Sequence, residues 1–144
     1  MIWMLRHGEA EDGAGKPDAE RELTGKGERQ SRDAGRALKA IGVKLDVCLT
    51  SPKARARRTA ELACEALRVD VETDGRLAGG DFDPYELAAG RGEVLLVGHE
   101  PDFSRAVAMA TGSRVKFRKG GVAAFDDHLL HALLRPKDLR ELAE

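Results

Sequence analysis

The chain is poor in cysteine and has no surplus of charge of either sign. Its 144 residues include two cysteines, and 24 Lys and Arg residues nearly balance 25 Asp and Glu residues, for a formal net charge of −1. Cys48 and Cys64 are too few for a disulfide framework and lack the spacing of a zinc site, so we expect buried, reduced thiols. The balanced charge argues against electrostatic binding to nucleic acid or to an anionic membrane.

Long apolar runs are also missing. No apolar stretch approaches membrane-spanning length, and the amino-terminus lacks the basic region and long apolar core of a secretory signal. We therefore expect a soluble, cytoplasmic protein that binds neither nucleic acid nor membrane. The length fits one domain, residues 1–144, without a repeat or a linker.

Short apolar runs alternate with segments of helical periodicity. The apolar runs predict four strands and a closing hairpin, at residues 2–5, 45–50, 69–73, 93–97, 120–125 and 129–134. Strands that alternate with helices predict an α/β fold, a single-domain three-layer α/β/α sandwich with a mainly parallel sheet.

The helices and loops between these strands have recognisable boundaries. Thr24 is expected to cap a helix at 25–41, whose apolar face comprises Ala34, Ala37, Leu38 and Ile41. Ser51, which is followed by a proline, predicts the cap of a second helix, and a third is expected after Pro101. Residues 8–22 and 74–92 are expected to be loops, the second with a short helix at 84–89.

Three of the predicted strands lead into residues with chemical potential. These are Arg6 and His7 after the first strand, Ser51 and Arg55 after the second, and Gly98 and His99 after the fourth. Because the carboxyl ends of parallel strands line one crevice, we expect these residues to meet in one pocket. Arg55 also lies in the basic run 53–58, which is typical of a solvated helix face, but the joint placement at three strand ends favours a site.

The contents of this pocket suit a phosphoryl group. Arginine offers forked donors that match phosphate oxygens, and helix N-termini add unpaired N–H groups. A neutral histidine is a nucleophile toward phosphorus and leaves readily afterwards. Gly8, which has no side chain, is expected to let the backbone approach the oxyanion closely.

Four ordered motifs resemble those of the histidine phosphatase superfamily, the phosphoglycerate mutase-like proteins, and among them the small SixA-type phosphohistidine phosphatases. "LRHGEA" is similar to the Arg-His-Gly signature, "RELTGKG" to the segment that opens the first helix, "LTSPKARARRTAE" to the Ser-Pro-x-x-Arg motif and "LLVGHEP" to the second-histidine motif. "KGGVAAFD" fits the late strand of the family. The resemblance covers residues 1–112 and implies a phosphoglycerate mutase-like fold.

The resemblance assigns roles residue by residue. It implies that His7 is the nucleophile that becomes transiently phosphorylated and that Arg6, Arg55 and His99 surround the phosphoryl group. Arg21 is expected to add a contact to phosphate or substrate. Ser51 and Thr59 are expected to cap and pack their helix. No metal or other cofactor is expected, because the arginines and histidines supply the positive charge.

The chain departs from larger family members in the short stretch before the second-histidine strand. Larger members carry there an insertion that covers the pocket and supplies an acid. Asp81, Asp83 and Glu86 are the candidate general acids in this chain, although surface carboxylates are the favoured interpretation. We therefore expect a comparatively open pocket and no mutase activity.

The lack of a clear general acid affects which class of substrate is favoured. An alkoxide leaving group normally needs a proton from the enzyme, whereas the imidazole of phosphohistidine leaves more easily. The favoured function is therefore removal of phosphate from a phosphohistidine-bearing protein, such as a phosphotransfer domain, with inorganic phosphate as product. The alternatives are a phosphomonoesterase acting on a small phosphorylated metabolite and a non-catalytic module that binds phospho-ligands.

Several polar residues are not assigned to the site. His128 and His131 lie an odd number of residues apart in the hairpin and so point to opposite faces of a strand, which favours exposed histidines over a metal pair. Lys119 lies near the glycine pair of the late strand, but we do not place it in the pocket.

Overall fold

Six strands form one mixed sheet in the computed structural model, which describes residues 1–144. The strands are β1 (Ile2–Arg6), β2 (Val47–Thr50), β3 (Val71–Thr73), β4 (Val94–Gly98), β5 (Val122–Asp126) and β6 (Leu129–Leu134). Their order across the sheet is β3-β2-β4-β1-β5-β6. Strands β1 to β4 run parallel to one another, whereas β5 runs antiparallel to both β1 and β6. The mainly parallel sheet and the closing hairpin are thus confirmed.

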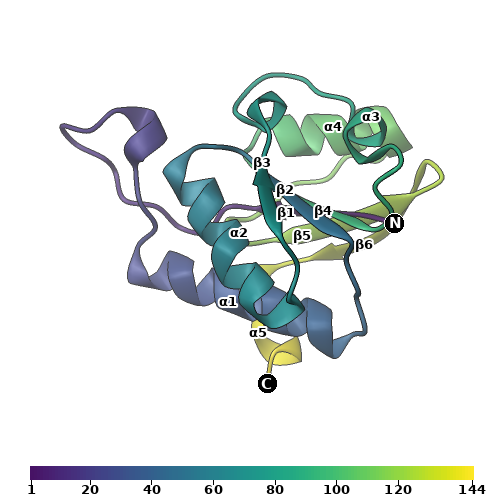
Figure 1. Cartoon of the computed structure of the whole chain (residues 1–144), viewed down its shortest axis with the longest axis horizontal. Helices are drawn as coiled ribbons and strands as arrows, with labels where there is room; N and C mark the ends of the chain where they lie inside the picture. Colours follow the sequence, from purple (N-terminus) through teal and green to yellow (C-terminus); the bar gives the residue numbers. More distant parts are fainter.

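Helices cover both faces of the sheet, which confirms the predicted three layers (Figure 1). The helices are α1 (Gly25–Ala40), α2 (Ala54–Leu67), α3 (Pro84–Ala88), α4 (Asp102–Thr111) and α5 (Pro136–Leu142), with 3-10 turns η1 (Asp18–Glu20) and η2 (Gly75–Leu77). Figure 1 shows α1, α2 and α5 on one side of the strands and α3 and α4 on the other.

Alternation along the strands builds a core on each face. In β1, Trp3 and Leu5 pack with the small residues of α1 and α2, whereas Ile2 and Met4 pack toward α3 and α4. All four side chains are buried, as expected of a central strand whose side chains point alternately to two covered faces. Cys48 and Cys64 are buried and unbonded, as predicted.

Two boundaries differ from the sequence prediction. The α1 helix ends at Ala40, and Ile41 is 46% exposed, so it does not belong to the buried face. Helix α2 begins at Ala54 with Lys53 as its N-cap, because the Ser51 hydroxyl is engaged with His99 and with the Lys53 N–H instead. Thr24 caps α1 as predicted, since its hydroxyl accepts from the Gly27 N–H.

Three elements were not predicted at all. The turns η1 and η2 interrupt the expected loops 8–22 and 74–92. Helix α5 follows the hairpin and packs its buried Leu139 into the core beneath α1. Pro136 at the first position of α5 and the Asp138 carboxylate, which accepts from the Arg135 N–H at 2.9 Å, mark its start. No helix of the chain is long and apolar enough to cross a membrane.

The strand register fixes where the candidate site lies. Arg6 pairs with Gly98, and Thr50 pairs with Val97, so β1, β2 and β4 end at the same edge of the sheet. The backbone continues this alignment, since the His7 N–H donates to the Gly98 carbonyl and the Ser51 N–H donates to the Val97 carbonyl, both at 3.0 Å. The residues that follow the three strands therefore face one common space.

Candidate active site

The two histidines predicted to meet do lie side by side at this edge. The ring centroids of His7 and His99 are 5.2 Å apart, with the rings tilted by 56°. Their exposed fractions are only 7% and 6%, respectively. Residues separated by most of the chain are thus brought together in a largely desolvated place.

Hydrogen bonding selects one tautomer of His7. Its Nδ1 lies 2.7 Å from the Gly8 carbonyl oxygen, which can only accept, so Nδ1 carries the proton and Nε2 keeps a lone pair. Burial lowers the pKa of His7 to about 4, against the opposing effect of the Gly8 bond and with help from the charges of Arg55 and Arg6. The ring is therefore neutral at pH 7, with Nε2 in its nucleophilic form.

His99 is tied to the end of β2. Its Nε2 lies 2.8 Å from the Ser51 hydroxyl oxygen, which also accepts from the Lys53 N–H at 3.2 Å. Burial lowers the pKa of His99 to about 3, and the nearby charge of His7 adds to this effect. Ser51 therefore orients a site histidine, a contact that its predicted role as a helix cap did not include.

Arg55 points inward from the first turn of α2, in contrast to its basic neighbours. It is 6% exposed, whereas Arg57 and Arg58 are exposed and pair with Glu61. Its Nη1 donates to the Asp18 carbonyl at 2.8 Å and its Nη2 to the Asp18 carboxylate at 3.1 Å. Arg55 is thus a buried cation at the site and does not belong to a solvated face.

Arg6 is held by the segment that precedes β5. Its Nη1 donates to the Phe117 carbonyl at 2.9 Å, and burial lowers its pKa, an effect that the charge of Glu100 opposes. Because every residue has a backbone carbonyl, the hydrogen bond from Arg6 to Phe117 could not be predicted from the sequence. The same segment places Lys119 close enough for its charge to lower the pKa of His7.

Unpaired polar atoms concentrate at this site. Four buried side-chain nitrogens have no hydrogen-bond partner, and three of them are Nε of Arg6, Nε of Arg55 and Nδ1 of His99. Each unpaired buried group costs about 1–3 kcal/mol, and such groups are few in folded proteins. A cluster of three unpaired nitrogens, two of them on guanidinium groups, is suited to a ligand rich in acceptor oxygens.

Gly8 serves a different purpose from the one predicted. Its N–H donates to the Thr59 hydroxyl at 3.1 Å and is therefore not free for an oxyanion. A Cβ at Gly8 would lie 2.5 Å from the Gly27 carbonyl oxygen, so glycine here permits close approach of the first turn of α1. Thr59 packs within the fold as expected and in addition donates to the Arg55 carbonyl at 2.7 Å.

Arg21 reaches the site only through another residue. Its Nε donates to the Glu11 carbonyl at 2.8 Å, and its Nη1 donates to the Asp18 carboxylate at 3.1 Å. Asp18 therefore lies between Arg21 and Arg55, a position that sequence reasoning missed. The available signal was an acid three residues before Arg21 in a loop otherwise assigned to solvent.

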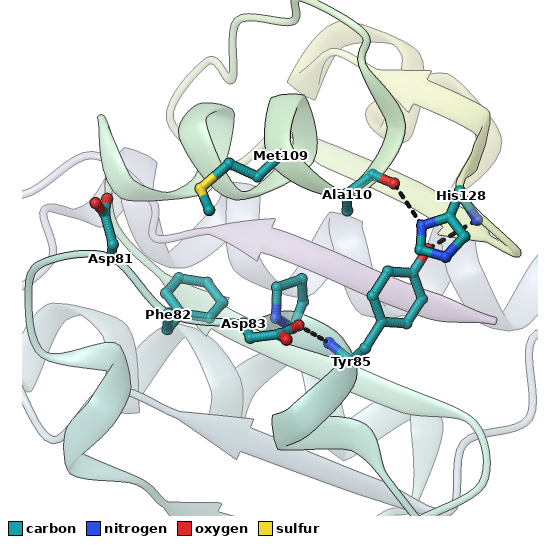
Figure 2. A pocket seen from close by; sticks show the side chains of 8 residues that line it. Asp81, Phe82, Asp83, Tyr85, Met109, Ala110 and His128 are labelled. Carbon is teal, nitrogen blue, oxygen red and sulfur yellow. Dashed lines mark hydrogen bonds between the residues drawn. The ribbon is translucent and has the colours of Figure 1, made fainter.

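No hydrogen bond or ion pair joins the three candidate acids to His7 or His99. Figure 2 shows Asp81 and Asp83 at a separate cavity of about 410 Å³ between α3, α4 and the β5–β6 turn. Asp81 pairs with Arg105 at 3.0 Å, and Asp83 caps α3, with its carboxylate accepting from the Tyr85 N–H at 2.9 Å. Glu86 is exposed on α3. The structure thus supports the interpretation of all three as surface carboxylates.

The location of α3 explains why Asp83 and Glu86 are remote from the histidines. The ring of Tyr85 packs against Phe125 at a centroid distance of 5.7 Å, and Phe125 pairs with Ile2 at the beginning of β1. The two histidines lie beyond the other end of that strand. His128, which packs on Tyr85, shares this remote end and is exposed, as is His131.

The reactive side chains are themselves little exposed. His7, Arg55 and His99 are each at least nine-tenths buried. The reason is that the segment carrying η1 places Asp18 directly on Arg55, while residues 117–120 close over Arg6.

Comparison with known proteins gives consistent matches. The family model for the histidine phosphatase superfamily (branch 1) matches residues 2–91. An uncharacterized protein from Picosynechococcus sp. is 35% identical over 134 residues, which cover 84% of this chain and 81% of that protein. The chain also matches phosphoglycerate mutases but spans less than half of their length. The 2,3-bisphosphoglycerate-dependent enzyme of Methylobacterium sp., for example, is 40% identical over 74 residues, with 34% of that enzyme covered.

Two solved structures share the whole architecture. The protein histidine phosphatase SixA complexed with tungstate is 25% identical, with a TM-score of 0.82 and coverage of 96% of this chain and 98% of that one. A protein from Agrobacterium tumefaciens provisionally assigned as the phosphohistidine phosphatase SixA has a TM-score of 0.83 at 23% identity, with coverage of 94% and 97%. At that identity the second likeness establishes the fold alone.

Proposed function

Since this chain belongs to the histidine phosphatase superfamily and is a phosphatase, we propose that it removes phosphate from phosphohistidine in a protein, with His7 as the nucleophile. The observation that carries this proposal is the neutral, buried His7, whose Nε2 lone pair stands beside two arginines while its Nδ1 is fixed by Gly8. A module that only binds phospho-ligands has no need of such a nucleophile, which argues against the non-catalytic alternative.

The first step transfers the phosphoryl group to the enzyme. Nε2 of His7 attacks phosphorus and forms a P–N bond, while the P–N bond of the substrate breaks and its electron pair returns to the leaving imidazole, which takes a proton from water. Arg6 and Arg55 offer charged donors to the phosphoryl oxygens, where pre-placed donors are commonly worth about 2.7–4 kcal/mol. His7 keeps its Nδ1 proton throughout, bonded to the Gly8 carbonyl.

The second step frees the enzyme. Water attacks phosphorus, the bond to Nε2 breaks, its electron pair returns to His7, and inorganic phosphate leaves with the proton balance met by solvent. Ser51 supports this step through His99: its hydroxyl already accepts from the Lys53 N–H, so its own proton is available for Nε2 of His99. With the Ser51 proton donated to Nε2, the proton of His99 is on Nδ1, which has no partner in the protein and can donate to a phosphoryl oxygen.

The choice of phosphohistidine over an ester rests on the carboxylates around the site. Arg21 and Arg55 hold the pKa of Asp18 well below its usual range, so this carboxylate has no proton to give at neutral pH. The Glu100 carboxylate accepts from the Ser104 N–H at 2.7 Å. Without a committed acid, ester hydrolysis loses about 10²–10⁴-fold, whereas an imidazole leaves without enzymic help.

A trapping experiment tests the nucleophile. The wild type and His7→Gln are incubated with a protein carrying ³²P-phosphohistidine and quenched in alkali, because acid destroys phosphohistidine. Label is expected on the wild-type chain and to be absent from His7→Gln, with His131→Gln as a control that retains it. Equal labelling of all three proteins would refute the assignment of His7.

A parallel measurement of turnover tests the substrate class. The same phosphohistidine protein is compared with p-nitrophenyl phosphate and with small sugar phosphates. We expect a higher kcat/KM for the phosphohistidine protein. A clear preference for a small ester would instead favour the phosphomonoesterase, to which the match with phosphoglycerate mutases lends support.

A further inference from the structure

The short turn η1 is held on the molecule by its polar contacts. None of its residues, Asp18–Glu20, is buried, and its surroundings are rich in charge and glycine. Within this turn Asp18 makes the hydrogen bonds to the site, both of them to Arg55. Its contacts therefore set where this segment lies relative to Arg55.

Asp18 accepts two hydrogen bonds from the Arg55 guanidinium. The Asp18 carbonyl accepts from Nη1 at 2.8 Å, and the carboxylate accepts from Nη2 at 3.1 Å, so both terminal nitrogens of Arg55 are oriented by one residue. Arg21, at 3.1 Å, and Lys53, at 3.4 Å, contact the same carboxylate and fix it in turn. Such a fork-shaped contact restricts rotation of the guanidinium plane.

The contact lies on the outer side of Arg55. The Asp18 side chain is 56% exposed, whereas that of Arg55 is 8% exposed. On its inner side, Arg55 is close enough to His7 and His99 for its charge to lower the pKa of both. Asp18 thus covers the guanidinium from the solvent and leaves the side toward the histidines, with its unpaired Nε, to a ligand.

We propose that Asp18 is a positioning residue, which holds Arg55 in the orientation that binds the transferred phosphoryl group. The effect on kcat rests on the proposed function, whereas the effect on the affinity for inorganic phosphate can be measured without turnover. It predicts that orientation matters more than charge: the amide of asparagine keeps an acceptor oxygen for Nη2, whereas alanine removes it.

The test compares Asp18→Ala, Asp18→Asn and the matched control Glu20→Ala, which removes an exposed carboxylate from the same turn. Hydrolysis of the phosphohistidine protein gives kcat and KM, and titration calorimetry gives the affinity for inorganic phosphate. We expect Asp18→Ala to lower kcat about tenfold, with a smaller change in KM, as for the loss of one hydrogen bond to a charged group. Asp18→Asn should recover most of this loss, and Glu20→Ala should match the wild type.

Other outcomes overturn the inference. Equal losses in the two Asp18 variants would mean that the carboxylate acts through its charge alone. Higher turnover and tighter phosphate binding in both would mean that Asp18 obstructs the site. If the wild type fails to hydrolyse phosphohistidine, the proposed function fails, but weaker phosphate binding by Asp18→Ala than by Asp18→Asn still supports positioning. The positioning role of Asp18 is rejected if every variant binds inorganic phosphate as tightly as the wild type does. It is also rejected if the wild type binds no phosphate.

Discussion

At the scale of single residues, the protonation of His7 ties the chemistry to the stability of the fold. The ordinary pKa of a histidine is 6.5, and burial brings that of His7 to about 4. Between these two values the unfolded chain binds a proton that the folded chain does not. The free energy of unfolding therefore falls as the pH drops through this window and is fully recovered above pH 6.5.

This linkage predicts that His7→Gln is less sensitive to acid than the wild type. The pKa shift of His7 corresponds to about 3 kcal/mol of unfolding free energy between neutral pH and pH 4. Urea denaturation at pH 7 and at pH 4.5 measures the loss for each protein, and most of the contribution of His7 should vanish in the variant.

The exposed His131 supplies the control for this measurement. His131→Gln should lose as much stability on acidification as the wild type does. If His7→Gln shows the same loss as His131→Gln, His7 is not held neutral by its surroundings, and the argument for its nucleophilic form at neutral pH weakens.

At the scale of secondary-structure elements, the strands and most helix starts could be predicted because their causes are local. The run preceding Gly98 is apolar throughout since β4 is buried on both faces, and Thr24 carries its own capping hydroxyl. The start of α2 could not be predicted from the sequence. The Ser51 hydroxyl is a good N-cap by residue type, but it lies against His99, and that contact depends on the tertiary fold. Helix α5 has a proline and an acid at its start, but it is stabilised mainly by packing of Leu139 into the core beneath α1.

The contact between α1 and α2 depends on the absence of one side chain. A Cβ at Gly35 would lie 2.1 Å from the Ala63 carbonyl oxygen of α2, which is backbone and must shift. Gly35→Ala is therefore expected to lower the free energy of unfolding by about 1–3 kcal/mol, despite the gain in helix propensity.

Gly25 of α1 provides a control for the steric effect at Gly35. Gly25 lies in the first turn, and a Cβ there meets only the end of the Arg29 side chain at 3.5 Å. Gly25→Ala should leave stability unchanged or raise it by up to about 1 kcal/mol. The measurement is urea denaturation of both variants at pH 7, and a gain in stability in Gly35→Ala would show that the helices can separate without cost.

At the scale of the whole molecule, the sequence was informative where function follows from topology. His7, Arg55 and His99 could be assigned to one site because parallel strands end at one edge. The partners of the arginines could not be assigned, since Asp18 comes from a segment without periodicity and Phe117 contributes only its carbonyl.

The distance between the two ends of the sheet predicts the behaviour of the carboxylates at its far end. Asp83→Asn and Glu86→Gln are expected to leave kcat for both phosphohistidine and p-nitrophenyl phosphate within about twofold of the wild type, because α3 lies at the opposite end of β1 from His7. Asp81→Asn breaks the pair with Arg105 but, as an exposed pair, should change stability by less than about 1 kcal/mol.

Steady-state kinetics on the two substrates checks this prediction, with thermal unfolding to confirm that each variant is folded. A loss of more than tenfold on both substrates in any one variant would identify that carboxylate as a general acid after all. The case for phosphohistidine would then lose its chemical basis, and a small phosphate ester would become the better substrate.

The central place of β1 has a consequence for biosynthesis. This strand is hydrogen-bonded on one side to β4 and on the other to β5, that is, to residues 94–98 and 122–125. As the chain leaves the ribosome, residues 2–6 emerge long before either neighbour exists, and both of their edges stay open to any other extended chain. An apolar segment in this state stays exposed to non-native strand pairing until the strand bearing Phe125 has been made.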